Sequence, residues 1–152
     1  MRYRIVAVGQ LKRGFYEEGC AFYLDRLQRV TGIEVLEIKD GKDRDGDRRK
    51  AAESASLLEQ ADGRVVALDE RGKQFGSEDL AQIVSLAETQ AVSRLSFLIG
   101  GADGHSAELL NRADEVWRLS DLTLPHELAR LVLLEQLYRA EMIRSGHPYH
   151  RA

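Results

Sequence analysis

Short apolar runs alternate with longer amphipathic stretches along the whole chain. The short runs are rich in β-branched residues, whereas the longer stretches repeat apolar residues at helical spacing. The pattern predicts five strands, at 2–9, 33–38, 64–68, 95–99 and 115–119. It also predicts five helices, at 15–30, 48–60, 77–90, 106–112 and 126–144. Strict alternation of strands and helices indicates an α/β fold, with a parallel sheet flanked by helices on both faces.

The last predicted helix, 126–144, is apolar on more than one side. Pro125 suits the first turn of this helix, and Thr123 is expected to be its N-cap. Ser77 is expected to cap the helix at 77–90. Because a surface helix needs only one apolar stripe, we expect the second apolar side of 126–144 to contact another subunit.

Two arginines, Arg130 and Arg139, interrupt the apolar surface of the same helix. Glu127 and Glu135 lie three or four residues before them, so each arginine could form an ion pair within the helix. Arg139 lies in the more apolar segment, and a buried arginine needs a partner. A bound anion could be that partner, which makes Arg139 a candidate ligand-binding residue.

Length and composition indicate one domain, 1–152, in a reducing compartment. A chain of 152 residues with 43% hydrophobic residues is long enough for one full core. The single Cys20 excludes an intrachain disulfide. The apolar run at the start is too short for a secretory signal, and no run reaches membrane-spanning length. We therefore expect a cytoplasmic protein that does not contact membranes.

The net charge of −3 is unlike the basic excess of most nucleic-acid-binding proteins. Basic residues nevertheless cluster twice, once in 44–50 and once in 144–151. Three aspartates dilute the first cluster, so we interpret it as a solvated face. In the second cluster, His147 and His150 have the spacing to chelate a metal, but no further ligands accompany them, and we expect no metal site.

Ligands of parallel sheets bind beyond the carboxyl ends of the strands. Three predicted strands end there in polar or glycine-containing loops, at 68–69, 100–104 and 119–125. The second loop has glycines that allow close backbone approach, but it matches neither G-x-G-x-x-G nor a P-loop. No Ser-His-Asp or Cys-His nucleophile pattern is visible. Asp69 and Glu70 could act in acid–base chemistry, although a polar loop end is the simpler interpretation.

Four segments together resemble the RlmH family of SPOUT-class methyltransferases. They are LIGGxxG at 98–104, LSxLTLPH at 119–126, EQLYRA at 135–140 and HPYH at 147–150. The resemblance extends over the whole chain. It implies methylation of N3 of a pseudouridine in 23S ribosomal RNA, with the assembled ribosome as substrate. That substrate would reconcile an acidic chain with an RNA target, because local basic patches and shape could suffice for binding.

The resemblance also implies a C-terminal trefoil knot that holds S-adenosylmethionine, and a homodimer whose last helices pack together. Carried over by position, the cofactor-binding residues are Leu68, Gly101, Ser120, Asp121, Leu122, Thr123, Leu124 and Pro125. This chain departs from the family at Arg118, which is often a serine in relatives. Asp121 occupies a variable position and could alter cofactor affinity.

Arg139, Tyr149 and His150 are expected to act on the substrate side, as implied by the resemblance. Tyr149 and His150, with Arg139, would hold the flipped base and offset charge on the deprotonated ring. The ordinary histidine pKa of about 6.5 would let His150 accept the N3 proton. Three alternatives stay open: a SPOUT enzyme with another RNA target, a non-catalytic ribosome-binding factor, and a flavodoxin-like nucleotide-binding domain, which the glycine loop after the fourth strand disfavours.

Overall fold

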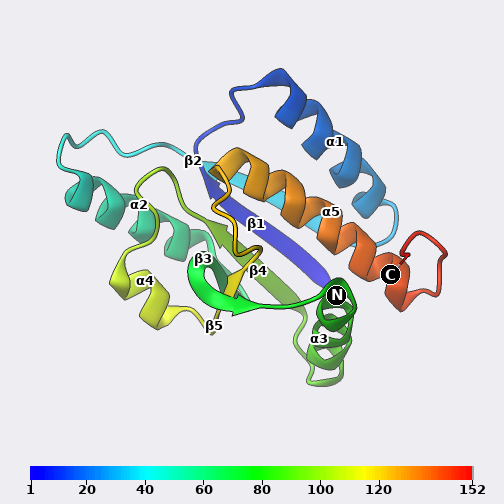
Figure 1. The fold of residues 1–152 in the computed structure, drawn as a ribbon. Helices are drawn as coiled ribbons and strands as arrows, with labels where there is room; N and C mark the ends of the chain where they lie inside the picture. Colours follow the sequence, from blue (N-terminus) through cyan, green and yellow to red (C-terminus); the bar gives the residue numbers. More distant parts are fainter. Residues whose placement is uncertain (152) are drawn as a thin grey trace.

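A computed structural model describes residues 1–151 of the chain. Its centre is a five-stranded, entirely parallel sheet in the order β2-β1-β4-β3-β5 (Figure 1). The strands are β1 Arg2–Val8, β2 Gly32–Ile38, β3 Arg64–Gln74, β4 Arg94–Ile99 and β5 Glu115–Arg118. The helices are α1 Gly14–Gln28, α2 Gly46–Gln60, α3 Ser77–Thr89, α4 Ala107–Arg112 and α5 His126–Arg144. The expected α/β architecture is therefore confirmed.

Helices cover both faces of this sheet, and each face has its own apolar core. α1, α3 and α5 pack on one face, with α5 lying between the other two (Figure 1). Alternate residues of the strands, such as Ile5 and Phe97, point into this larger core. Their neighbours Val6 and Leu98 point to the opposite face, where α2 and α4 pack. The central strands β1 and β4 are therefore buried on both sides, whereas the edge strand β2 is only half-buried.

Helix α5 is only partly covered within one chain. Its side chains contact the sheet below and α1 and α3 on either flank. Several of its apolar residues, among them Leu128, Leu131 and Val132, are half-buried. The expected contact of this helix with another subunit therefore stays a prediction. No helix within residues 1–151 is long and apolar enough to cross a membrane.

Both expected helix caps are wrong. Pro125, not Thr123, is the N-cap of α5, and no side chain bonds to that helix start. Gly76 caps α3, with its backbone N–H donating to the Asp79 carboxylate at 3.0 Å. Ser77 is instead the first helical residue, and its hydroxyl donates to Gln136 of α5 at 2.6 Å. The Ser77 hydroxyl thus forms a contact between two helices, and not the helix cap that the local sequence pattern predicts.

Strand β3 is longer than expected, because residues 69–73 form a bulge rather than a terminal loop. Trp117 of β5 pairs first with Leu68 and again with Lys73, so the intervening residues arch away from the ladder. After β5 the chain returns across the sheet to start α5 (Figure 1). The arch of β3 and this returning segment border the same region. The trefoil knot itself stays a prediction.

Gly72 in this bulge is expected to be intolerant of any side chain. A Cβ at this position would lie 2.5 Å from the carbonyl carbon and oxygen of Val116. Gly72→Ala should therefore destabilise the protein by about 2–3 kcal/mol, as overpacking does. Gly14→Ala is the matched control, since a Cβ there meets no described atom within 4 Å. Urea denaturation checks both variants, and equal midpoints for the two would contradict the expected crowding.

Candidate functional site

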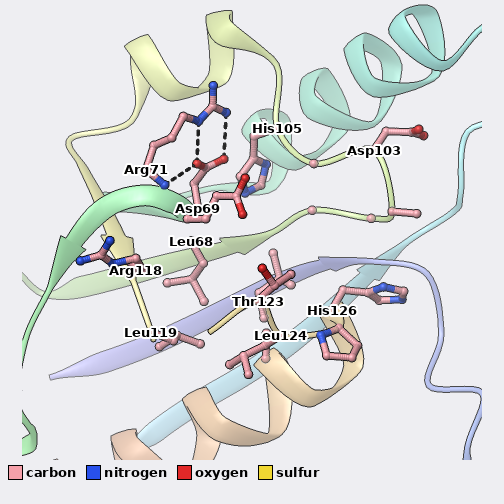
Figure 2. Close-up of a pocket in the computed structure, with 18 of the residues that line it drawn as sticks. Leu68, Asp69, Arg71, Asp103, His105, Arg118, Leu119, Thr123, Leu124 and His126 are labelled. Carbon is pink, nitrogen blue, oxygen red and sulfur yellow. Dashed lines mark hydrogen bonds and ion pairs between the residues drawn. The ribbon is translucent and has the colours of Figure 1, made fainter. Parts of the chain in front are cut away.

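A cavity of about 560 Å³ lies beside the bulge of β3 and the carboxyl ends of β4 and β5 (Figure 2). Its walls come from the bulge of β3, the loop after β4, and the segment between β5 and α5. These are the three strand-end loops selected from the sequence. The volume is within the range of small-molecule and cofactor sites.

Seven of the eight expected cofactor-binding residues line this cavity: Leu68, Gly101, Ser120, Leu122, Thr123, Leu124 and Pro125. Asp121 is the exception. Its side chain is 77% exposed and forms an ion pair with Arg118 at 3.1 Å. The carboxylate thus points out of the site, whereas Arg118 contributes to the cavity wall.

One side of the cavity is apolar, and its floor is glycine backbone. Figure 2 shows Leu68, Leu119 and Leu124 gathered toward the start of α5. A Cβ added at Gly101 would lie 3.1 Å from Val8 Cγ1, so the backbone packs closely against β1. An apolar wall beside exposed backbone groups suits a flat heterocycle that also forms hydrogen bonds.

The opposite side carries a charged pair, Asp69 and Arg71, drawn with dashed lines in Figure 2. The Arg71 side chain donates to the Asp69 carboxylate from Nε at 2.8 Å and Nη2 at 3.0 Å, and its backbone N–H donates at 2.9 Å. These hydrogen bonds hold the pKa of Asp69 below its usual value. A carboxylate stabilised in this way is a poor proton acceptor, which argues against Asp69 as a general base.

His105 lies behind the loop after β4 and was not singled out in the sequence. It is 3% exposed, and its Nε2 lies 3.1 Å from the Leu98 carbonyl oxygen. Nδ1 has no hydrogen-bond partner among the described residues. Burial lowers the pKa of His105 despite the nearby Asp69 carboxylate. The imidazole is therefore neutral at pH 7 and forms part of the cavity wall.

The depressed pKa of His105 predicts a loss of stability in mild acid. Below the ordinary histidine pKa of about 6.5 the unfolded chain binds a proton that the folded chain does not. The free energy of unfolding should then decrease as the pH is lowered, by at most about 1.4 kcal/mol per pH unit from this group. Urea denaturation at several pH values should show a smaller slope for His105→Leu. His147→Gln, in the exposed tail, should keep the wild-type slope; identical slopes in all three proteins would contradict the assignment.

Arg139, Tyr149 and His150 form a second cluster, at the C-terminal half of α5. Glu135 Oε1 accepts from Arg139 Nε and Nη2, at 3.0 and 2.6 Å, and from the Tyr149 hydroxyl at 3.0 Å. Arg139 Nη1 lies 3.1 Å from His150 Nδ1. The guanidinium carbon is 4.8 Å from the centre of the Tyr149 ring. The structure thus brings together all three residues expected on the substrate side, and it confirms the helical ion pair for Arg139.

Arg130 has a different partner from the one expected. It is 3% exposed and donates to Glu37 of β2 at 2.5 Å and to the Gly9 carbonyl at 3.0 Å. Glu127, the neighbour in the helix, instead accepts from the backbone N–H of Lys12. Arg130 is therefore a buried link between α5 and the ends of β1 and β2.

The cavity and the second cluster are well separated along α5. Ala129 lines the cavity, whereas Arg139 lies ten residues further along the same helix. At 1.5 Å per residue this is about 15 Å. Arg139, Tyr149 and His150 therefore lie outside the cavity of their own chain. Within residues 1–151, no three His, Cys, Asp or Glu side chains gather as a metal site.

Comparisons with known proteins agree with this fold and site. A family model described as "Predicted SPOUT methyltransferase" matches residues 1–150. A protein of Synechococcus sp. (strain RCC307), named "Ribosomal RNA large subunit methyltransferase H", is 46% identical over 151 residues, covering 99% of this chain and 95% of the relative. A protein of the same name from Rubrobacter xylanophilus is 47% identical over 157 residues, covering 98% of each chain.

A solved structure from Haemophilus influenzae Rd KW20, titled "a probable methylase family protein", aligns with a TM-score of 0.58. It is 12% identical, and the alignment covers 99% of this chain and 70% of that one. At this identity the similarity establishes the fold alone. Together, the family model and the curated relatives establish that this chain belongs to the SPOUT methyltransferase family, within the RlmH group.

Proposed function

We propose that this chain transfers a methyl group from S-adenosylmethionine to N3 of a pseudouridine in 23S ribosomal RNA, acting on the assembled ribosome. The observation that carries the proposal is the cavity built from three strand-end loops. It is lined by seven of the eight residues carried over for cofactor binding. Relatives that are over 40% identical, and of which the alignments cover at least 95%, are named as ribosomal RNA methyltransferases, which supports the RNA substrate.

The residues around the cavity fit S-adenosylmethionine. Leu68, Leu119 and Leu124 offer an apolar surface for the adenine ring. Gly101 packs closely against β1 on one side, and its backbone lines the cavity, where it could bond to the nucleoside. Ser120 and Thr123 add hydroxyl groups for its polar atoms. When bound, the cofactor supplies a methyl group on a positively charged sulfur. The protein must align the accepting nitrogen with that methyl group and remove the N3 proton.

The second cluster suits the RNA base. Arg139 provides a fixed positive charge, and Tyr149 provides an aromatic ring beside it. Burial raises the pKa of Tyr149, so this residue remains a neutral phenol that can donate a hydrogen bond. A cation and a ring at this place would hold an extruded base and offset negative charge on it.

His150 can accept the proton only after a change in its contacts. Arginine has no acceptor, so Nδ1 of His150 must use its lone pair to accept from Arg139. In the neutral ring the proton is then on Nε2, which lies 3.5 Å from Glu78. We infer that His150 releases Arg139 when RNA binds, which frees the Nδ1 lone pair for the N3 proton.

We propose a homodimer, because the cavity and the cluster of one chain are about 15 Å apart along α5. Two copies related by a twofold axis could place the cluster of one chain over the cavity of its partner. Each dimer would then contain two complete sites, each formed by the cavity of one chain and the cluster of the other. Size-exclusion chromatography with light scattering tests this directly, and a monomer at micromolar concentration would contradict it.

A methyl-transfer assay with labelled S-adenosylmethionine tests the function. The substrates are 70S ribosomes, isolated 50S subunits and naked 23S RNA, all from a strain that lacks the enzyme. We expect label in the large-subunit RNA of 70S ribosomes, located on a pseudouridine by mass spectrometry. Label at another nucleotide would support a different RNA target. Ribosome binding without any turnover would support a non-catalytic factor.

A further inference from the structure

Side chains of helix α2 form hydrogen bonds to the loop after β4 and to a residue just beyond it. This loop, residues 100–104, is named here the glycine loop. Arg49 of α2 donates to both carboxylate oxygens of Asp103, from Nε at 2.6 Å and from Nη2 at 2.9 Å. One turn further along α2, the Ser54 hydroxyl accepts from the Ser106 N–H at 2.9 Å, just beyond the loop. The floor of the cavity is therefore attached to α2 by Arg49 and Ser54, which do not themselves line the cavity.

The same face of α2 also holds the charged loop, residues 39–45. The third donor of Arg49, Nη1, bonds to the Asp43 carbonyl at 2.9 Å. Glu53 is buried, and its Oε2 accepts from the Gly41 N–H at 2.8 Å. Its other oxygen lies 3.3 Å from where a Cβ on Gly101 would stand. Arg49 thus contacts both loops, and Glu53 contacts the charged loop.

A glycine-rich loop loses much conformational freedom when it becomes ordered. A loop that is already fixed avoids this cost when a ligand binds, and affinity increases accordingly. Asp103 is the only charged side chain in the glycine loop, and Arg49 binds it with two donors in fork geometry. The ion pair is therefore placed to keep the loop in one conformation before any ligand arrives.

We propose that Arg49 is a positioning residue for the methyl donor: it fixes the glycine loop through Asp103 and links it to the charged loop through Asp43. The inference rests on the proposed binding of S-adenosylmethionine in the cavity. It predicts that the two loops are ordered together. Cofactor binding at the glycine loop would then also order the charged loop, which carries Lys39, Lys42 and Arg44.

Isothermal titration calorimetry with S-adenosylmethionine and S-adenosylhomocysteine tests this role. We expect Arg49→Met and Asp103→Asn each to raise the Kd about tenfold, as is typical for a lost coupling of this kind. Arg49→Lys should recover part of the affinity, because an ammonium keeps one contact. The double variant should bind no more weakly than either single variant, since both remove the same ion pair.

Arg48→Met is the matched control. This neighbour on α2 has a side chain that is 76% exposed, and it reaches Asp45 only at 3.6 Å. Its Kd should stay within about twofold of wild type, as for most surface changes. In turnover assays, Arg49→Met should raise the KM for the cofactor and leave kcat at saturation nearly unchanged. A variant that merely unfolded part of the chain would lower kcat as well.

Hydrogen exchange provides a second readout. In Arg49→Met, the amides of the glycine loop and of the charged loop should lose protection together, whereas those of β1 should not change. If wild type binds the cofactor and Arg49→Met and Asp103→Asn bind as tightly as Arg48→Met, the positioning role is wrong. If wild type itself binds no cofactor, the proposed function is wrong instead.

Discussion

Arg139→Gln is expected to lower the rate of methyl transfer to ribosomes about a hundredfold or more, with the Kd for S-adenosylmethionine unchanged. Glutamine cannot supply the positive charge that offsets a deprotonated base, and losing one such electrostatic group costs rates of this order. The affinity should persist because Arg139 is far along α5 from the cavity. Single-turnover kinetics on 70S ribosomes, together with calorimetry, separate the two quantities. A large rise in the cofactor Kd would show that Arg139 acts on the cavity instead.

The same variant tests whether two chains share each site. Gly101→Val should lose cofactor binding, since its Cβ would crowd Val8 and push the glycine loop into the cavity. Mixed dimers of Gly101→Val and Arg139→Gln would contain one intact site, formed by the cavity of one chain and the cluster of the other. Random pairing of the two inactive proteins should therefore restore about a quarter of wild-type activity. No recovery in verified mixed dimers would contradict a shared site.

Local sequence pattern was sufficient for most of the fold. Helix α5 begins and ends at the predicted residues, since Pro125 cannot continue a helix backwards and Gly146, with φ of +73°, ends it. Strand β3 was predicted too short because its second half, from Lys73, is defined only by pairing with β5. Such a pairing depends on a strand that lies over 40 residues later in the chain, and periodicity over a few residues cannot reveal it.

In the candidate site, too, some features could be predicted from the sequence and others could not. The rule that ligands lie at the carboxyl ends of parallel strands led to the three loops that form the cavity. It could not identify His105 as a buried wall residue, because a histidine after a glycine loop has no distinctive spacing. Nor could it identify the Arg49–Asp103 pair, whose members are 54 residues apart. Contacts between side chains of different helices and strands depend on tertiary packing. The positions of the loops, in contrast, follow from the order of strands and helices along the chain.

Arg130 illustrates that limit and carries the second large prediction. Its partner Glu37 is 93 residues away in the sequence, although Glu127 offered a closer one. Arg130→Met should lower the free energy of unfolding by about 3 kcal/mol, because it leaves the Gly9 carbonyl and the Glu37 carboxylate without their donor. For a chain of this length this corresponds to a fall in Tm of roughly 6–12 °C. Calorimetric and urea unfolding measure the change.

A double-mutant cycle assigns this loss to the ion pair rather than to packing. Glu37→Gln should cost less than Arg130→Met, since the Glu37 side chain is 36% exposed and can be solvated. The double variant should lose less free energy of unfolding than the sum of the two single losses, by about 1 kcal/mol or more, because each change removes the same contact. Strict additivity would mean that Arg130 stabilises the protein mainly through Gly9 and its own packing. Because Arg130 follows Ala129, which lines the cavity, the bonds from Arg130 to the ends of β1 and β2 also fix the α5 side of the cavity.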